Sequence, residues 1–444
     1  MKYLPEDSVK AAWFGTYEGA MNESRMRSTP WSHLFKGLNR TAWWTAGVAS
    51  SQGGFSNTSA LAPDGTPLQP FAWAADEIRK IRESGIGALI VNAKKKRFPI
   101  AVHYSNPCLH ASTLNPDQST WQASHENISL ALTSCGLDYD FLSPKELENG
   151  KLHDYRILLL PYSQALSEAE CRQIRSFVKN GGLLIADFNP GIMDEHGKLL
   201  PKSRLLDVFG RFSRLHVNAY GKGHAVCLTD YLAGFKAKLQ KGTADGLMRG
   251  MMRLFREYAA VEPFAVVVNE KECLEAHFVF EAAGFHYLCM LGPTEASKKL
   301  AGGAESSSET FGASASPVRK LRLPKKFHVW DPLDSYRYLG FVDSATLDLK
   351  PFTGRVLVLS EKKPPALQAA PEKREIRRGE SLRLQVANPA PVMLLDIPGL
   401  RGPSRVFGGE IHIRTAYNDP PGDYRLTLRH PVTGQSETIS FKLK

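Results

Sequence analysis

The sequence has no apolar run that approaches the ~20 residues of a membrane-spanning helix. Its first residues, MKYLPEDSVKAAWFG, also lack the long apolar segment of a secretory signal. From these two absences we expect no membrane partner. The protein is expected to be cytoplasmic if Met1 is its true start; the alternative is that the true N-terminus is missing.

Cysteine is scarce, and none of it has C-x-x-C spacing. The cysteines are Cys108, Cys135, Cys171, Cys227, Cys273 and Cys289. A disulfide framework and a zinc site therefore have no support from the sequence. We expect buried free thiols, no metal and no cofactor.

Acidic residues are fewer than basic ones, 45 against 56, which gives a net charge of +11. The basic residues are nevertheless spread along the chain, and the one compact run is Lys94–Arg97. We expect this run to form a solvated linker. Because no groove-reading motif or basic helix is present, no nucleic-acid partner is expected.

A βαβ unit is the clearest pattern that the sequence does contain. The apolar runs 157–161 and 183–186 flank a segment with Ser167 as its N-cap, acidic residues in its first turn and a Gly181-Gly182 stop. Two buried parallel strands joined by a capped helix indicate a doubly wound sheet, which carries its ligands at the carboxyl ends of the strands.

One of these strand ends is followed by a polar cluster of Asp187, Asp194, Glu195 and His196. Carboxylate and imidazole groups of this kind could bind a metal. The alternative, which we favour, is a capped loop that contacts a neighbouring subunit or the rim of a barrel. The GKG sequence at 221–223 precedes a strand rather than a helix, so it predicts a hairpin turn and not a phosphate site.

The pattern divides the chain into four regions. Residues 1–97 predict strand, helix (around 30–37), strand (40–45) and helix (71–84), and residues 98–262 hold the doubly wound sheet. Residues 263–362 alternate like strands of a small β domain, and 374–444 predict a β-sandwich after a proline-rich linker.

The stretch from IAVHYSNPCLHAS to LLLPYSQALSEAECRQIRSFVKNGGLLIADFNPGIMDEHGK resembles the central domain of β-galactosidases of glycoside hydrolase family 42. That module is called the β-galactosidase trimerisation domain, and its fold is similar to flavodoxin-like class I glutamine amidotransferases. The resemblance implies that 1–97 form the last βα units of a (β/α)8 barrel, and that the later β regions match the family's β domains. It also implies a homotrimer.

Only about 95 residues precede the central domain, whereas a full barrel needs roughly 200 to 250. We therefore expect the C-terminal portion of a longer protein, inactive alone; the alternative is that a second polypeptide completes the barrel. The family's strand-seven nucleophile corresponds to Glu18, with Glu23 as the weaker choice and an ordinary loop acid as the plain alternative. The strand-four acid/base has no counterpart.

Tryptophans near these strand ends are candidate substrate-binding residues. Trp43 and Trp44 could stack on a sugar or pack in the barrel core, and Trp31, with Arg27, could line the same rim. Amidotransferase chemistry is not expected, because the strand end at Tyr162-Ser163-Gln164 has no Cys on a glycine-flanked elbow. Ser163 also lacks the G-x-S-x-G context of a hydrolase nucleophile.

The expected function is retaining hydrolysis of terminal β-glycosides, with a carbohydrate substrate and no cofactor. The alternative is a non-catalytic protein that binds carbohydrate or acts as an assembly scaffold.

Overall fold

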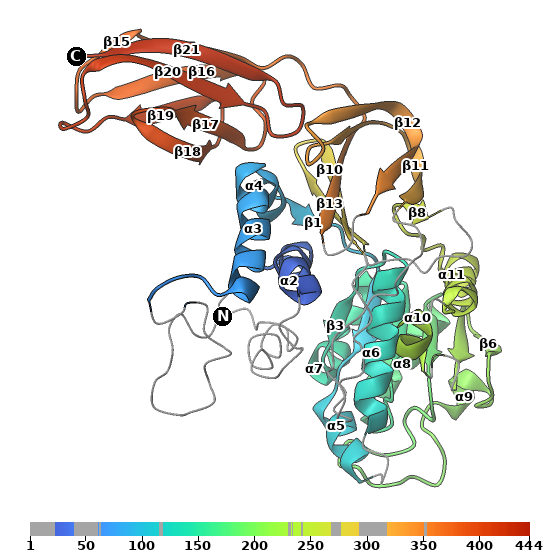
Figure 1. The fold of residues 1–444 in the computed structure, drawn as a ribbon. Helices are drawn as coiled ribbons and strands as arrows, with labels where there is room; N and C mark the ends of the chain where they lie inside the picture. Colours follow the sequence, from blue (N-terminus) through green and yellow to red (C-terminus); the bar gives the residue numbers. More distant parts are fainter. Residues whose placement is uncertain are drawn as a thin grey trace. The chain divides into compact units, whose positions relative to one another are not determined.

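The computed structural model describes residues 23–39, 61, 64–114, 119–229, 232, 234–240, 243–267, 277–292, 318–349 and 353–444 (Figure 1). The chain forms two compact units. The first unit holds the residues up to Lys95 together with the β regions from Phe278 onward, and the second unit holds Lys96–His277. No described helix is long and apolar enough to span a membrane.

A six-stranded sheet with strand order β3-β2-β4-β5-β7-β6 forms the centre of the second unit. All neighbouring strands are parallel except β6 and β7, which form the predicted hairpin. The strands are β2 (Ile100–His103), β3 (Asp140–Leu142), β4 (Ile157–Leu160), β5 (Leu183–Ala186), β6 (His216–Tyr220) and β7 (Gly223–Cys227). A short β8 (Val266–Val267) follows later in the chain and is not one of these six strands.

The βαβ unit read from the sequence is confirmed. Helix α8 (Glu168–Lys179) connects β4 to β5, and its N-terminus is closed by a capping box. In that box the Ser167 hydroxyl accepts from the Glu170 backbone N–H, and the Glu170 carboxylate accepts from the Ser167 N–H. The central strands are fully buried, which explains why their sequences are continuous apolar runs.

Helices cover both faces of this sheet. One apolar core joins the strands to α6 (Ser119–Ser134) and α11 (Asp245–Ala259), and the other joins them to α7 (Pro144–Glu148), α8 and α9 (Leu206–Phe209). The remaining helical segments are α5 (Asn106–Thr113), η3 (Lys151–Asp154) and α10 (Phe235–Gln240). This arrangement leaves the carboxyl ends of the strands as the edge where side chains of several elements meet.

The first unit contains a mainly antiparallel sheet and a β-sandwich. The sheet follows the path β1 (Lys94–Lys95), β9 (His277–Ala282), β10 (Phe285–Leu291), β13 (Gly354–Ser360), β11 (Val318–Asp331), β12 (Arg337–Asp348). The sandwich pairs a three-stranded sheet with a five-stranded sheet around one core. Its strands are β14 (Gln368–Pro371), β15 (Glu375–Ile376), β16 (Ser381–Ala387), β17 (Met393–Ile397), β18 (Arg401–Val406), β19 (Glu410–Arg414), β20 (Gly422–Arg429) and β21 (Ser436–Leu443).

The predicted class, α/β followed by β, is confirmed in this coarse form. The expected strands near Glu18 and at 40–45 lie outside the described residues, so the interpretation of segment 1–97 as the end of a barrel stays a prediction. The helix predicted at 71–84 is α3 (Gln69–Glu83), which is followed by α4 (Ile86–Val91).

Two local predictions were wrong. The helix expected from Pro30 begins a full seven residues earlier, as α2 (Glu23–Phe35), and Pro30 lies inside it rather than in its first turn. The basic run expected to be a solvated linker contains β1, where Lys94 pairs with Glu281. The Lys95 ammonium lies 4.6 Å from the Phe278 ring centroid, because a lysine stem can pack on an aromatic face.

Candidate functional site

Three of the four site residues predicted from the sequence, Glu18, Trp43 and Trp44, lie outside the described residues. The fourth, Trp31, is on α2 and is buried. Its indole N–H donates to Glu77 of α3 at 3.0 Å, and its ring lies where a side chain at position 354 would be, so Gly354 makes the contact possible. Because Trp31 is only 1% exposed, its indole has no free face on which a sugar could stack, and the proposed sugar contacts do not include it.

Glu77 accepts hydrogen bonds from several polar side chains around this tryptophan. Its buried carboxylate also accepts from Arg27 at 3.1 Å and from Lys80 at 2.7 Å. A buried carboxylate needs such partners to remain in the fold. The Arg27 guanidinium, which the sequence suggested for a sugar-binding rim, is held by Glu77 and by Glu23.

The carboxyl edge of the second unit brings together a hydroxyl, an imidazole and a carboxylate. His103, the last residue of β2, has its Nδ1 2.9 Å from the Ser163 Oγ and its Nε2 3.0 Å from the Glu170 Oε1. Ser163 follows β4, and Glu170 is in the first turn of α8. The three side chains are 1%, 1% and 2% exposed.

The order of these groups is that of a hydrolase triad, but their burial gives them a different role. A nucleophile must be reached by its substrate, and the Ser163 hydroxyl is enclosed on all sides by the fold. The Glu170 carboxylate already accepts the Ser167 N–H in the capping box. We conclude that His103 has a structural role: its two ring nitrogens connect the ends of β2 and β4 to the start of α8. We call this connection the brace.

A second polar group lies one strand further along this edge. The Asp187 carboxylate accepts from the Tyr162 N–H at 2.6 Å and from the Ser124 hydroxyl. Burial raises the pKa of Asp187 to about 6, because desolvation disfavours its charged form. Burial also lowers the pKa of His125, whose ring nitrogens face two backbone carbonyls, to about 4.

Backbone strain occurs at this edge too. Tyr162 and Phe188, which follow β4 and β5, have φ values of +45° and +43°, and their rings are 5.3 Å apart. Such a conformation is costly for residues other than glycine and persists only when the surroundings enforce it. At Tyr162 the backbone N–H donates to the Asp187 carboxylate, and this hydrogen bond holds the residue in that conformation.

The acidic loop after β5 is held by its own hydrogen bonds. The Asp194 carboxylate accepts from the backbone N–H groups of His196 and Lys198, and Glu195 pairs with Arg204 at 2.9 Å. Asp187 does not join this loop; its carboxylate is buried and accepts from Ser124 and Tyr162. Across the described residues, no group of three or more His, Cys, Asp or Glu side chains is placed to hold a metal ion.

The cysteines within the described residues are free and buried, as expected: Cys108, Cys135, Cys171, Cys227 and Cys289. Burial raises the pKa of the Cys108 thiol to about 12, and its sulfur donates to the Ala165 carbonyl. Thiols protonated in this way are poor nucleophiles. Cys273 lies outside the described residues.

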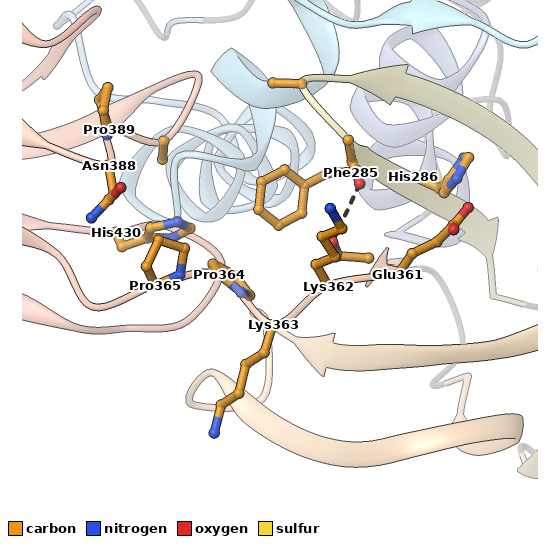
Figure 2. Close-up of a pocket in the computed structure, with 14 residues that line it drawn as sticks. Phe285, His286, Glu361, Lys362, Lys363, Pro364, Pro365, Asn388, Pro389 and His430 are labelled. Atoms are coloured by element: carbon orange, nitrogen blue, oxygen red, sulfur yellow. Dashed lines mark hydrogen bonds between the residues drawn. The ribbon is translucent and has the colours of Figure 1, made fainter.

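The first unit contains a cleft of about 480 Å³ between its antiparallel sheet and the β-sandwich. Figure 2 shows the Phe285 ring at its centre, with His430 and Pro365 across from it. The chain that leaves β13 forms one rim with Lys362 and Lys363. Periodicity alone could not reveal this cleft, because its lining comes from segments more than 100 residues apart.

Comparisons with known proteins agree with the resemblance seen in the sequence. Residues 114–230 match the family model of the β-galactosidase trimerisation domain. The fold resembles a catalytic mutant of Gan42B, a family 42 β-galactosidase from G. stearothermophilus, at 14% identity and a TM-score of 0.54, covering 76% of this chain and 51% of that one. A search of curated sequences finds no match.

Two further β-galactosidase structures give similar values. The enzyme from Bacillus circulans sp. alkalophilus is 14% identical with a TM-score of 0.53 over 76% of this chain and 52% of that one. The cold-adapted enzyme from Rahnella sp. R3 is 11% identical with a TM-score of 0.52 over 79% and 57%. The chain thus spans about half the length of these enzymes, and it is similar to them in fold over that span.

Proposed function

We propose that this chain is the C-terminal portion of a retaining β-galactosidase-type glycoside hydrolase that acts on terminal β-glycosides. The main support is the trimerisation-domain match at residues 114–230, joined to a fold shared with solved family 42 enzymes over 76% of the chain. The buried hydroxyl–imidazole–carboxylate group of the second unit takes no part in this reaction.

Retaining hydrolysis uses two carboxylic groups about 5–5.5 Å apart, one as nucleophile and one as acid/base. We assign the nucleophile to Glu18 and the sugar platform to Trp43 or Trp44. The acid/base comes from barrel residues outside these 444, either upstream in the same polypeptide or in a second one. The 444 residues are therefore inactive alone.

The test assays a chromogenic β-galactoside with the 444-residue chain and with the polypeptide that includes any coding sequence preceding Met1. Only the longer protein is expected to be active, and Glu18→Gln should lower its kcat more than about a hundredfold. Glu23→Gln is the matched control, because Glu23 is an exposed acid that pairs with Arg27. Activity of the 444 residues alone would overturn the assignment, as would loss of activity in Glu23→Gln but not in Glu18→Gln.

We further propose that the protein assembles as a homotrimer through the second unit, which carries the trimerisation domain. Light scattering on the purified chain should then give three times its mass of 49.2 kDa. A monomer at micromolar concentration would contradict this proposal.

A non-catalytic carbohydrate-binding scaffold is the second candidate, and the cleft beside Phe285 favours it. The same assay separates the two. If the longer polypeptide binds glycans but hydrolyses none, the scaffold function replaces the hydrolase.

A further inference from the structure

A row of side chains crosses one face of the sheet in the first unit. Phe285, Ser360, His328 and Phe341 are successive cross-strand partners on β10, β13, β11 and β12. Residues directly opposite each other on neighbouring strands point to the same face. At the usual spacing between strands, the row is about 14 Å long.

A β-bulge adds a fourth ring to this row. Val329 pairs with Gly340 but Trp330 pairs with Tyr338, so Leu339 is the extra residue on β12. Residues three apart on a regular strand face opposite sides, and the bulge instead turns Tyr338 to the side of Phe341. The His328 ring centroid consequently lies 6.0 Å from that of Tyr338 and 4.7 Å from that of Phe341.

Phe285, at the inner end of the row, is 8% exposed, whereas the two outer rings are exposed and held in place. Tyr338 is 42% exposed and Phe341 is 51% exposed. The Tyr338 hydroxyl lies 2.6 Å from the His328 Nδ1, and its ring packs 5.1 Å from the buried Trp330. Side chains fixed in this way lose little conformational freedom on contact with a ligand.

The inner end of the row opens into the cleft, since Phe285 is the ring at its centre. The other end of the same sheet face is covered by α2, where Trp31 packs on Gly354 of β13. The part of the face that α2 leaves open is therefore the part that carries the row.

Positive charge lies between the cleft and the rings. Lys362 and Lys363 line the cleft, and the Lys363 ammonium is 5.6 Å from the Tyr338 ring centroid. Figure 2 shows Lys363 extending away from Phe285. Within the described part of the chain, no carboxylate forms an ion pair with either lysine, and the adjacent Glu361 already pairs with Lys325 at 2.6 Å.

We propose that this aromatic row (Phe285, His328, Tyr338 and Phe341) and its cleft bind a polysaccharide chain that carries carboxylate or sulfate groups. The C–H faces of pyranose rings stack on aromatic rings, and the row is long enough for more than one sugar. The lysine ammonium groups pair with the anionic substituents. A second copy of this chain is a poorer occupant, because lysine is depleted from the cores of protein–protein interfaces.

Affinity electrophoresis and titration calorimetry on the full 444-residue chain test the proposal. The probes are polygalacturonate, which is anionic, and β-1,4-galactan, which is neutral. Tyr338→Ala/Phe341→Ala should weaken polygalacturonate binding about tenfold or more. Phe407→Ala removes a ring of 53% exposure elsewhere in the first unit and should leave binding unchanged.

A second pair of substitutions tests whether the positive charge of Lys362 and Lys363 contributes to binding. Lys362→Gln/Lys363→Gln should lower affinity for polygalacturonate to that for galactan without changing galactan binding. The proposal is overturned if the double aromatic variant binds like the wild type, if Phe407→Ala loses binding equally, or if galactan binds as tightly as polygalacturonate. It is also overturned if the aromatic variant changes the oligomeric mass and not glycan binding, which would assign the row to a second copy.

Discussion

The carboxyl edge of the second unit and the aromatic row of the first unit each contain a histidine within hydrogen-bond distance of a hydroxyl group, but the two regions differ in exposure to solvent. At the edge, His103, Ser163 and Glu170 satisfy one another and are almost fully buried. In the row, Tyr338 contacts Trp330 and Phe341 contacts His328, yet about half of each of these two outer side chains is exposed. The difference shows that hydrogen-bonded order alone does not mark a site, because a ligand also needs an exposed face.

Glu170→Ala should have the largest effect, and only on stability. It removes the partner of a buried imidazole and one half of the α8 capping box, which should cost about 2–4 kcal/mol in the free energy of unfolding. Urea unfolding of the chain measures this loss. Glu168→Ala, at an exposed acid on the same helix turn, is the control and should cost less than about 1 kcal/mol. Equal losses in the two variants would contradict the bracing role.

The pKa of Asp187 makes the edge sensitive to pH. Its folded pKa of about 6 exceeds the ordinary 3.8, so its protonated form stabilises the fold below pH 4, and this contribution is lost as the pH rises through 6. Asp187→Asn should therefore be more stable than the wild type at pH 7.5 by up to about 3 kcal/mol. The difference should vanish near pH 4.

His125 changes the stability of the fold in the opposite direction to Asp187 between pH 4 and pH 6.5. Its folded pKa of about 4 is below the ordinary 6.5, so its contribution is present above pH 6.5 and is lost as the pH falls through 4. Unfolding free energies measured from pH 4 to 8 in the wild type and in Asp187→Asn separate the two residues. A difference between the two proteins that does not change with pH would contradict burial of a charged Asp187.

Ser163→Ala tests whether the Ser163 hydroxyl has a structural role or a catalytic one. It leaves the His103 Nδ1 without its hydroxyl partner and should cost about 1 kcal/mol of stability. Glycosidase activity of the longer polypeptide should not change. Loss of any hydrolytic activity in this variant, with its fold intact, would show that Ser163 is a nucleophile.

Tyr338→Ala and Phe341→Ala should have the smallest effect on stability. Both side chains are half exposed, so the free energy of unfolding should change by no more than about 0.5 kcal/mol. Thermal unfolding checks this. A large destabilisation would mean that the rings belong to the core of the first unit and are not a binding surface.

The sequence predicted the second unit well, because its signals are local. The apolar runs of β4 and β5, the Ser167 cap and the Gly181-Gly182 stop each determine their own element. Helix α2 was misplaced because Pro30, usually a first-turn residue, lies in the helix interior.

The site features were harder to predict because they depend on distant contacts. His103 is a single residue at a strand end, and its partners lie 60 and 67 residues further along the chain. The aromatic row depends on strand register and on one bulged residue, Leu339, which no periodicity reveals. A histidine ending an apolar strand opposite a capping-box glutamate is the signal that could have pointed to the brace.

Hydrogen exchange in the presence of saturating polygalacturonate tests the contrast between the two regions most directly. We predict slower exchange in residues 326–343 and 360–365, around the aromatic row and its cleft, and no change in residues 162–170 at the carboxyl edge of the second unit. Protection at the carboxyl edge without protection of the row would contradict the account.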